Sequence, residues 1–393
     1  RHTRAWSRDD RIARSVADSD RLAWVEDRLQ RRAARLHVVS ATTTDVVIVG
    51  AGVAGLAVAA ALHERSVDTV LFEARTRVGG RLLSSAPDGQ RRLDLGATWF
   101  WPNERRVRSL VDELGVAHFA ERPDGDALYH VGGGAQRLDG NPLDTASYRF
   151  ADGADSLALA LADRLPTGAL ALGTPVRRVE HADGHLVVQA GQCATRAAQV
   201  VIALPPALAA AAVEFVPDLP EPLAGVAAST PVWMGSTTKV VIRYPTRFWR
   251  AQGLAGSAIS HVGPIRELHD ISGPDGEPPA IFGFVSGAAN APTVGADDVI
   301  AQLVELFGPA AAHATDVTIQ DWRHEAWTSP PSNGRLDDYR TYGHAVYQRP
   351  AWDGRLHWSS TETATDSPGH IEGALAAAER TVEAILCARD SAR

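Results

Sequence analysis

The sequence predicts an α/β fold in which a doubly wound, Rossmann-like domain is interrupted by an inserted α+β domain. Residues 46–73 read as strand, glycine turn, helix and strand, which is one βαβ unit of the doubly wound type. A further buried strand is predicted over Val200–Leu204, and an amphipathic helix over Ile371–Ala388. Between them, residues 214–317 are rich in proline and glycine and carry only scattered strands, as an inserted domain would.

Composition narrows the class of protein. The chain has 393 residues, 45% of them hydrophobic and 22% charged, which excludes global disorder and a coiled coil. Its net charge of −8 argues against a nucleic-acid partner. Its two cysteines leave no disulfide framework and no cysteine-based zinc site, so we expect no metal and a reducing, cytoplasmic location.

Neither a membrane helix nor a signal peptide is expected. The longest uncharged apolar stretch, Val46–Leu62, has 17 residues and contains glycines, which is short of the roughly 20 that span a bilayer. The first 40 residues hold ten arginines and six acids and no apolar core segment. We interpret residues 1–43 as a peripheral arm, with helical spacing of apolar residues over Leu22–Leu36.

The first elements follow in order from Asp45. Val46–Val49 is a β-branched run typical of a buried parallel strand, and Gly50–Gly55 is the turn after it. An alanine-rich helix is predicted over Leu56–Glu64. The second strand, Val70–Phe72, ends at Glu73.

Later elements have clear signals of their own. Asp183-Gly184 predicts a hairpin between residues 176–180 and 185–189. Strands are expected over Lys239–Tyr244 and Ala280–Val285, and a helix that covers a sheet over Ala296–Phe307.

The glycine turn predicts an adenine dinucleotide. In Gly50-x-Gly52-x-x-Gly55, the first glycine permits the tight turn, the second admits a pyrophosphate, and the third lets helix and strand pack closely. Glu73 stands 23 residues after Gly50, where a carboxylate can accept both ribose hydroxyls. The alternative is a βαβ unit with a purely structural role.

The residues after Glu73 distinguish FAD from a nicotinamide cofactor. Arg75-Thr-Arg-Val-Gly79-Gly80-Arg81 places bare backbone between arginines, close enough to touch a ligand, with cations to neutralise a pyrophosphate or a reduced flavin. A second dinucleotide motif is absent from the sequence, because Gly132–Gly134 lacks the third glycine and the flanking elements. A built-in NAD(P)H site is therefore not expected.

Taken together, these motifs resemble the flavin-dependent amine oxidase family, which includes monoamine and polyamine oxidases, over residues 44–390. The matching stretches are Val46–Leu62, Leu71–Arg81, Leu93–Trp99, Thr174–Val179 and Thr361–Thr365 with Gly369 and the helix from Ile371. The resemblance implies further cofactor contacts by Gly96, Ala97, Thr98, Val176, Trp322, Glu362, Gly369 and Ile371. It also implies that the final helix points its positive end at the flavin.

Lys239 is the strongest candidate for a catalytic residue. It lies in Thr237–Ile242, ahead of Phe248-Trp249-Arg250, and resembles the family's lysine that holds a water against flavin N5. It is also the only lysine, since the other 38 basic residues are arginine. A compact ammonium with a movable pKa differs from a rigid, always-charged guanidinium, so the exception favours a functional role over an ordinary exposed strand lysine.

The pocket departs from the family pattern. By resemblance, Trp99 and Trp327 border the substrate cavity, although any tryptophan can simply pack in a core. The two positions for the family's paired aromatic rings fall on Ser332 and His370. His370 can still stack or accept a proton, or else be a partly exposed histidine at a helix start. The position of the flavin-linking cysteine falls on Pro331, so FAD is expected to bind without a covalent bond.

These observations predict an FAD-dependent, amine oxidase-like enzyme. Hydride would leave a C–H bond next to an amine nitrogen for flavin N5, with O₂ as acceptor and hydrogen peroxide released. The alternatives are a desaturase or dehydrogenase acting on C–C bonds, similar to protoporphyrinogen oxidase, and a non-catalytic FAD-binding accessory protein. The substrate, and whether a homodimer forms, stay open. The expected FAD domain comprises 44–103, 151–213 and 320–393, and the expected substrate domain comprises 104–150 and 214–319.

Overall fold

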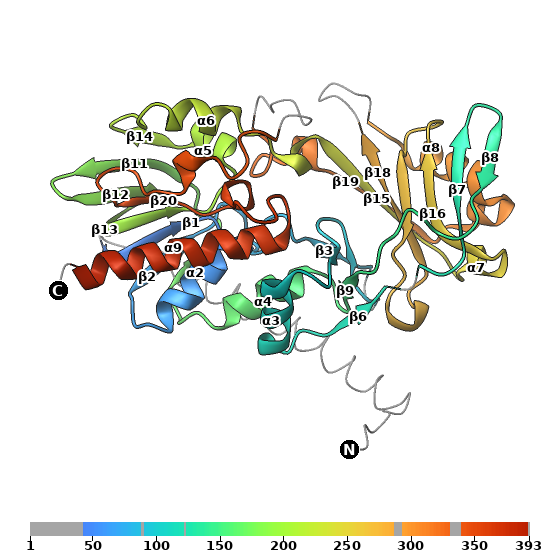
Figure 1. Cartoon of the computed structure of the whole chain (residues 1–393), viewed down its shortest axis with the longest axis horizontal. Coiled ribbons are helices and arrows are strands. Elements are labelled where there is room, and N and C mark those ends of the chain that lie inside the picture. The colour runs from blue at the N-terminus through green and yellow to red at the C-terminus, as the bar shows by residue number, and fades with distance from the viewer. Residues whose placement is uncertain (1–41, 88–89, 122, 287–292, 331–338, 392–393) are drawn as a thin grey trace, which may run out of the picture.

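The computed structural model describes residues 42–87, 90–121, 123–286, 293–330 and 339–391. Two sheets dominate it, one in each half of the elongated molecule (Figure 1). The arm at residues 1–43, with its predicted helix over Leu22–Leu36, lies outside the described residues except for the last two positions.

The larger sheet confirms the predicted doubly wound α/β fold. Its strand order is β10-β2-β1-β13-β12-β11-β14, with β20 pairing β13. The strands are β1 (Thr42–Val49), β2 (Thr69–Phe72), β10 (Leu170–Ala171), β11 (Val176–Ala182), β12 (His185–Ala190), β13 (Cys193–Ile202), β14 (Glu214–Val216) and β20 (Leu356–Trp358). Pairing is parallel from β10 through β13 and at β20, whereas β11 and β12 form the antiparallel hairpin predicted at Asp183-Gly184.

Burial on both faces explains the continuous apolar run in β1. Val46 and Ile48 pack into a core shared with the helices α2 (Val53–His63), α4 (Asp155–Asp163) and α9 (Ile371–Ser391). Val47 and Val49 face the opposite core, beneath α5 (Pro206–Ala212) and α6 (Leu223–Ser229). A half-exposed strand would need polar residues at alternate positions, and the run Val46–Val49 within β1 has none. The apolar stretch at 46–62 is thus a strand, a turn and a helix, and no described helix could span a membrane.

The smaller sheet has seven strands in the order β19-β15-β18-β17-β16-β7-β8. They are β7 (Asp126–Val131), β8 (Gly134–Arg137), β15 (Thr237–Arg243), β16 (Leu254–Ser260), β17 (Glu267–Asp270), β18 (Ala280–Ser286) and β19 (Asp316–Asp321). The helix α8 (Ala296–Phe307) covers one face, as predicted, with Val299, Leu303 and Phe307 in a shared core with Val240 and Ile242. The Gly132–Gly134 run forms the turn of the β7–β8 hairpin.

The remaining elements are mostly short. They are β3 (Ser84–Ser85), β4 (Leu93–Asp94), β5 (Trp99–Phe100), β6 (His118–Ala120), β9 (Tyr148–Phe150), α3 (Arg105–Leu114), α7 (Phe248–Ala251) and the 3-10 turns η1 (Trp233–Ser236), η2 (Pro274–Gly276), η3 (Pro309–His313), η4 (Trp322–His324), η5 (Ala345–Tyr347) and η6 (Thr361–Thr363). β3 pairs with β4, and β5 and β6 both pair with β9.

Two elements pack with the larger sheet, although the sequence placed their residues in the expected substrate domain. β14 extends the larger sheet beside β11, although residues 214–319 were expected in the substrate domain. α3 packs its buried Val107 and Val111 into the core of α2 and α9, although residues 104–150 were expected there too. In both cases the apolar face of the element finds its partner on the larger sheet's side, and local sequence carries no signal of that choice.

Candidate cofactor and substrate site

The glycine turn after β1 is built for a close ligand. Gly50 has φ of +104°, and a Cβ there would lie 2.8 Å from the Leu204 side chain. A Cβ on Gly55 would lie 2.0 Å from the carbonyl oxygen of Gly50, so helix and turn touch. By contrast, a Cβ on Gly52 would meet nothing within 4 Å, and no side chain caps α2 there. The N-terminus of α2 is therefore open to an anion such as a diphosphate.

Glu73 ends β2 beside this turn and is 4% exposed. Its Oε2 accepts the N–H of Ala51 at 2.8 Å, and its Oε1 accepts the N–H of Arg75 at 2.9 Å. Each carboxylate oxygen can accept more than one hydrogen bond, so Glu73 keeps capacity for the two ribose hydroxyls. The backbone contacts fix the carboxylate at the carboxyl edge of the sheet, where dinucleotides bind in this fold.

The segment 75–81 runs alongside the turn. Gly79 pairs with Gly52 through an isolated bridge, and both Gly79 and Gly80 have positive φ. Arg77 was not among the predicted cofactor residues. Its guanidinium donates to the carbonyl oxygens of Val78, Gly80 and Leu82 and so fixes the conformation of this loop. Its guanidinium therefore shapes the cradle.

Arg75 and Arg81 reach across to the C-terminal third of the chain. Arg75 donates to Thr328 Oγ1 at 2.8 Å and lies 3.4 Å from Glu325. Arg81 forms a two-point ion pair with Glu362, at 2.6 and 3.2 Å, and Glu362 is fully buried. Two predicted cofactor residues thus bind each other and tie η6 to the glycine loop.

The ends of the predicted family signature also meet. Gly369, with φ of +88°, donates its N–H to Thr361 Oγ1 at 2.8 Å, directly before α9 begins at the buried Ile371. Val176 is buried where β11 begins, at the edge of the larger sheet. With the open turn, Glu73 and Arg81–Glu362, these positions fit an FAD laid across the sheet.

Lys239 lies on β15, between β19 and β18 of the smaller sheet, and is fully buried. Its Nζ donates to the carbonyl oxygen of Gly96 at 2.9 Å and to Thr98 Oγ1, and it lies 4.2 Å from the centre of the Phe282 ring. An ammonium has three donors, so one remains for a water or a ligand.

Burial lowers the pKa of Lys239 to about 7, with a smaller lowering contribution from Arg149, while Asp94 opposes the shift. Trp322 is buried beside the segment Leu95–Thr98, and its indole N–H donates to the carbonyl oxygen of Leu95 at 2.9 Å. The Leu95–Thr98 backbone is therefore held from two sides, by Trp322 and by Lys239. Ala97 lies between those contacts and is half-buried.

A cavity of about 140 Å³ opens beside Trp99. Trp99 and Trp101 form one wall, and His269, Asp144 and Glu267 form another. The Trp99 indole lies edge-on to His269 at 5.1 Å and 5.2 Å from Phe282, which carries Lys239 on its face. Trp99 thus lines a cavity and is linked to Lys239 through the Phe282 ring; its role as a substrate wall stays a prediction.

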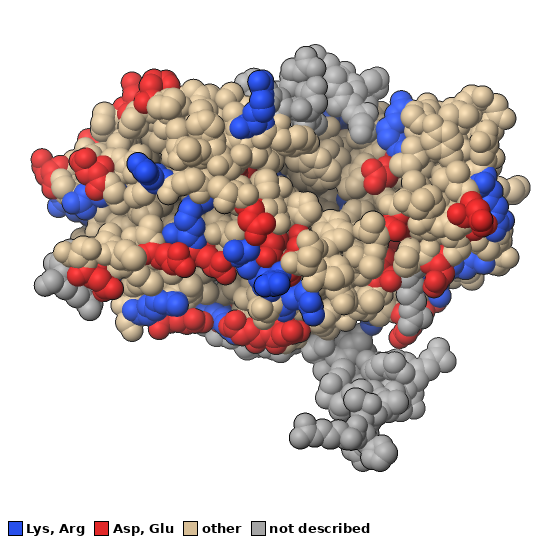
Figure 2. Space-filling view, viewed as in Figure 1, with Lys and Arg blue, Asp and Glu red and all other residues tan. Residues whose placement is uncertain are grey.

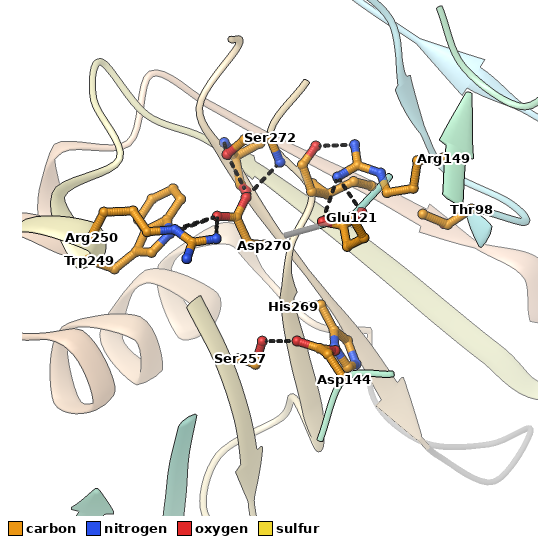
Figure 3. A network of polar contacts seen from close by, with 12 residues as sticks. Thr98, Glu121, Asp144, Arg149, Trp249, Arg250, Ser257, His269, Asp270 and Ser272 are labelled. Carbon is orange, nitrogen blue, oxygen red and sulfur yellow. Dashed lines mark hydrogen bonds and ion pairs between the residues drawn. The ribbon is translucent and has the colours of Figure 1, made fainter. Parts of the chain in front are cut away.

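The sequence analysis did not identify the polar residues that line the cavity. Nδ1 of His269 lies 2.5 Å from Asp144 Oδ1, and its Nε2 lies 2.8 Å from Glu267 Oε1. Figure 3 shows Asp144 beside His269. Nearby, Asp270 accepts from Trp249 and Arg250, and Arg149 pairs with Glu121. Glu267-x-His269 alternates along β17, but Asp144 is 125 residues away, and no local pattern predicts its approach.

The paired His269 makes stability depend on pH. Burial opposes its charge, but the contacts to Asp144 and Glu267 outweigh it and raise the pKa from 6.5 to about 9. The folded state binds the proton more tightly, so this contribution is complete below pH 6.5 and is lost as pH rises through about 9. Urea unfolding at pH 6.5 and 9.5 should show a larger loss in the wild type than in His269→Gln. Equal losses would contradict the assignment.

Three predicted pocket residues are less central. His370 Nδ1 lies 2.7 Å from Glu104 Oε1, and its ring lies 4.9 Å from Trp101, so it stands behind the wall of the cavity. The Trp327 indole lies over the Arg177 guanidinium at 5.0 Å, and Trp327 is not among the residues that line the cavity. Ser332, like Pro331, lies outside the described residues.

No group of three or more His, Cys, Asp or Glu side chains within the described residues could hold a metal ion.

Comparison with known proteins matches two family models. The model described as flavin containing amine oxidoreductase matches residues 143–386, and an NAD(P)-binding Rossmann-like domain matches residues 48–114. A putrescine oxidase of Kocuria rosea is 24% identical, over 86% of this chain and 94% of that protein. A flavin-containing amine oxidase of Oncorhynchus mykiss is 22% identical, over 88% of this chain and 86% of that protein.

The fold has solved counterparts. A putrescine oxidase structure with putrescine bound superposes with a TM-score of 0.78 at 23% identity, over 88% of this chain and all of that one. Cyclohexylamine oxidase from Brevibacterium oxydans IH-35A gives a TM-score of 0.75 at 22% identity, over 89% of this chain and all of that one.

Proposed function

Because the chain belongs to the flavin containing amine oxidoreductase family, we propose that it oxidises a C–H bond next to an amine nitrogen and uses O₂ as the acceptor. It is an FAD-dependent oxidoreductase of the amine oxidase type. When bound, FAD supplies a hydride acceptor at N5 and passes two electrons on to O₂, which leaves as hydrogen peroxide. The observation that carries the proposal is the sole lysine, which is fully buried against Gly96 and Thr98, in the segment that leads to Trp99 at the cavity.

Each group of residues has a proposed role that follows from its position. The turn with Gly52 holds the diphosphate and Glu73 the ribose, and the Leu95–Thr98 backbone supports the flavin ring. Trp99 and Trp101 exclude water from the cavity and orient the amine, and orientation alone can supply several kcal/mol of barrier lowering. Lys239 supplies a buried hydrogen-bond donor at the place where O₂ gains negative charge. Below its pKa of about 7 it is also a cation. The substrate side is the smaller sheet with the loops at 99–101 and 143–147.

A related desaturase acting on C–C bonds is the second candidate. The two positions of the family's amine cage favour it, since they hold Ser332 and His370 where the family usually has two tyrosines. The buried Lys239 disfavours it, because a donor at that place serves the oxygen half-reaction.

A screen decides between the candidates. Anaerobic flavin bleaching and peroxide release would be measured over monoamines, diamines, polyamines and amino acids, with putrescine and cyclohexylamine included because related structures carry those names. We expect at least one amine to bleach the flavin and release peroxide on admission of air. Bleaching by none would favour a non-catalytic FAD-binding protein or the desaturase.

We also propose that FAD is held without a covalent bond. Both cysteines lie away from the cradle, Cys193 at the start of β13 and Cys387 near the end of α9, and both are free, which suits a cytoplasmic location. Acid or heat should therefore release yellow FAD into the supernatant. Absorbance of the two fractions after precipitation checks this, and flavin retained in the protein pellet would contradict it. Glu73→Ala should lower flavin occupancy of the purified protein.

A further inference from the structure

Glu104 occupies an unusual place for a carboxylate. It is the residue before α3 and is only 3% exposed, yet no arginine or lysine is recorded on it among the described residues. Its Oε2 accepts the backbone N–H of Trp101 at 3.0 Å, and its Oε1 meets Nδ1 of His370 at 2.7 Å. A buried carboxylate needs donors, and here the imidazole supplies one of the two.

The His370 ring is fixed on several sides. Thr361 Oγ1 donates to its carbonyl oxygen at 2.8 Å, which anchors the backbone at the start of α9. The Trp101 indole lies 4.9 Å from the ring at 38°, and Trp101 also lines the cavity. The side chain is 46% exposed, and within the described part of the chain its Nδ1 makes the hydrogen bond to Glu104 and its Nε2 makes none.

Other charges at this junction are satisfied elsewhere. Arg106 of α3 binds Asp366, Glu372 and Glu379, which belong to the start of α9 and the loop before it. Figure 2 shows such acidic and basic side chains interleaved along the face that carries α9. Glu104 is therefore the carboxylate that acts on His370 itself.

We infer that Glu104 is a positioning residue for His370: its carboxylate holds Nδ1 of the imidazole and leaves Nε2, on the outer side of Trp101, to take a proton from the ammonium form of an amine that enters the cavity past Trp101. The proton moves from the substrate nitrogen to Nε2 and then to water, and the nitrogen keeps its lone pair for the oxidation of the neighbouring C–H bond. Nothing is oxidised or reduced in this step. The inference rests on the proposed function, because it needs an amine in the cavity.

The carboxylate has a measurable effect on the base. The hydrogen bond that His370 donates to Glu104 raises the pKa of His370, and the charge of Glu104 acts in the same direction, whereas burial lowers it. Removing that charge should lower the pKa of His370, because an adjacent opposite charge favours the protonated imidazole. His370 must be unprotonated to act, so the acidic limb of kcat/KM should move to lower pH by the same amount.

The test uses the FAD-loaded enzyme with ¹³C-labelled histidine. The His370 resonance is identified by its loss in His370→Gln and titrated in wild type and Glu104→Gln, which keeps an acceptor for the N–H of Trp101. The matched control is Glu379→Gln, an acid on the same helix pair that binds Arg106 and is 58% exposed. We expect the resonance pKa and the acidic limb of kcat/KM to fall together in Glu104→Gln and to stay unchanged in the control.

Two results would overturn the inference. An unchanged resonance in Glu104→Gln would show that the carboxylate does not hold the ring. A shifted resonance with an unshifted kinetic limb would show that His370 does not meet the substrate. Failure of the proposed function looks different, because then no amine bleaches the wild-type flavin at any pH, and the substrate step falls with it.

Discussion

Lys239→Met is expected to keep FAD bound, to leave anaerobic reduction by the substrate within about tenfold, or roughly 1.4 kcal/mol of barrier, and to slow reoxidation by O₂ far more. The reason is local: the buried Nζ has one donor left after Gly96 and Thr98. O₂ gains negative charge as it is reduced, and loss of one preorganised donor to such charge costs roughly 10²-fold or more. Stopped-flow spectroscopy measures the two half-reactions separately.

The pH dependence sharpens this prediction. The pKa of Lys239 is lowered to about 7 by burial, so the cation is present below that pH and is lost above it. Wild-type reoxidation should therefore slow as pH rises through about 7, and the Met variant should show no such step. Lys239→Arg should rescue only part of the rate, since the larger fork cannot occupy the same enclosed space. Equal reoxidation rates in wild type and Lys239→Met would remove the lysine from the mechanism and favour the desaturase.

The fold was largely predictable because its signals are local. The β-branched run at 46–49, the turn at 50–55 and the acid at 73 each follow from backbone geometry within a few residues. β1 begins at Thr42, four residues before the predicted start, because Thr42–Thr44 pair with Thr195–Ala197 of β13. β13 itself begins at Cys193 rather than near Val200, and ends before Ala203, since pairing with β12 adds its first half. Strand ends are set by partners that are distant in sequence.

The candidate site was only partly predictable for the same reason. Lys239 stood out as the one lysine, and the structure buries it against Gly96 and Thr98 of the segment that the resemblance had marked. The assembly Asp144–His269–Glu267 carries no such mark, because common residue types meet across 125 positions. Glu104 is likewise an ordinary helix-start acid until α9 brings His370 to it. Tertiary contacts of common residues need the fold before they can be seen.

A matched pair of glycine substitutions should separate cofactor binding from folding. A Cβ on Gly55 would lie 2.0 Å from the carbonyl oxygen of Gly50, in the wall between helix and strand. Gly55→Ala should therefore lower the free energy of unfolding of the flavin-free protein by about 1–3 kcal/mol, as overpacking does, and abolish flavin retention. At Gly52, φ is −72° and a Cβ would meet no protein atom within 4 Å.

Gly52→Ala should accordingly leave the stability of the flavin-free protein within about 1 kcal/mol, the scale of a change at a helix N-cap, and still weaken FAD binding strongly. The added methyl would occupy the space through which the diphosphate approaches the N-terminus of α2. Denaturant unfolding of both flavin-free variants and flavin titration by fluorescence give the two quantities independently. If Gly52→Ala bound FAD as the wild type does, the diphosphate could not lie against this turn, and the open face of Gly52 would need another occupant.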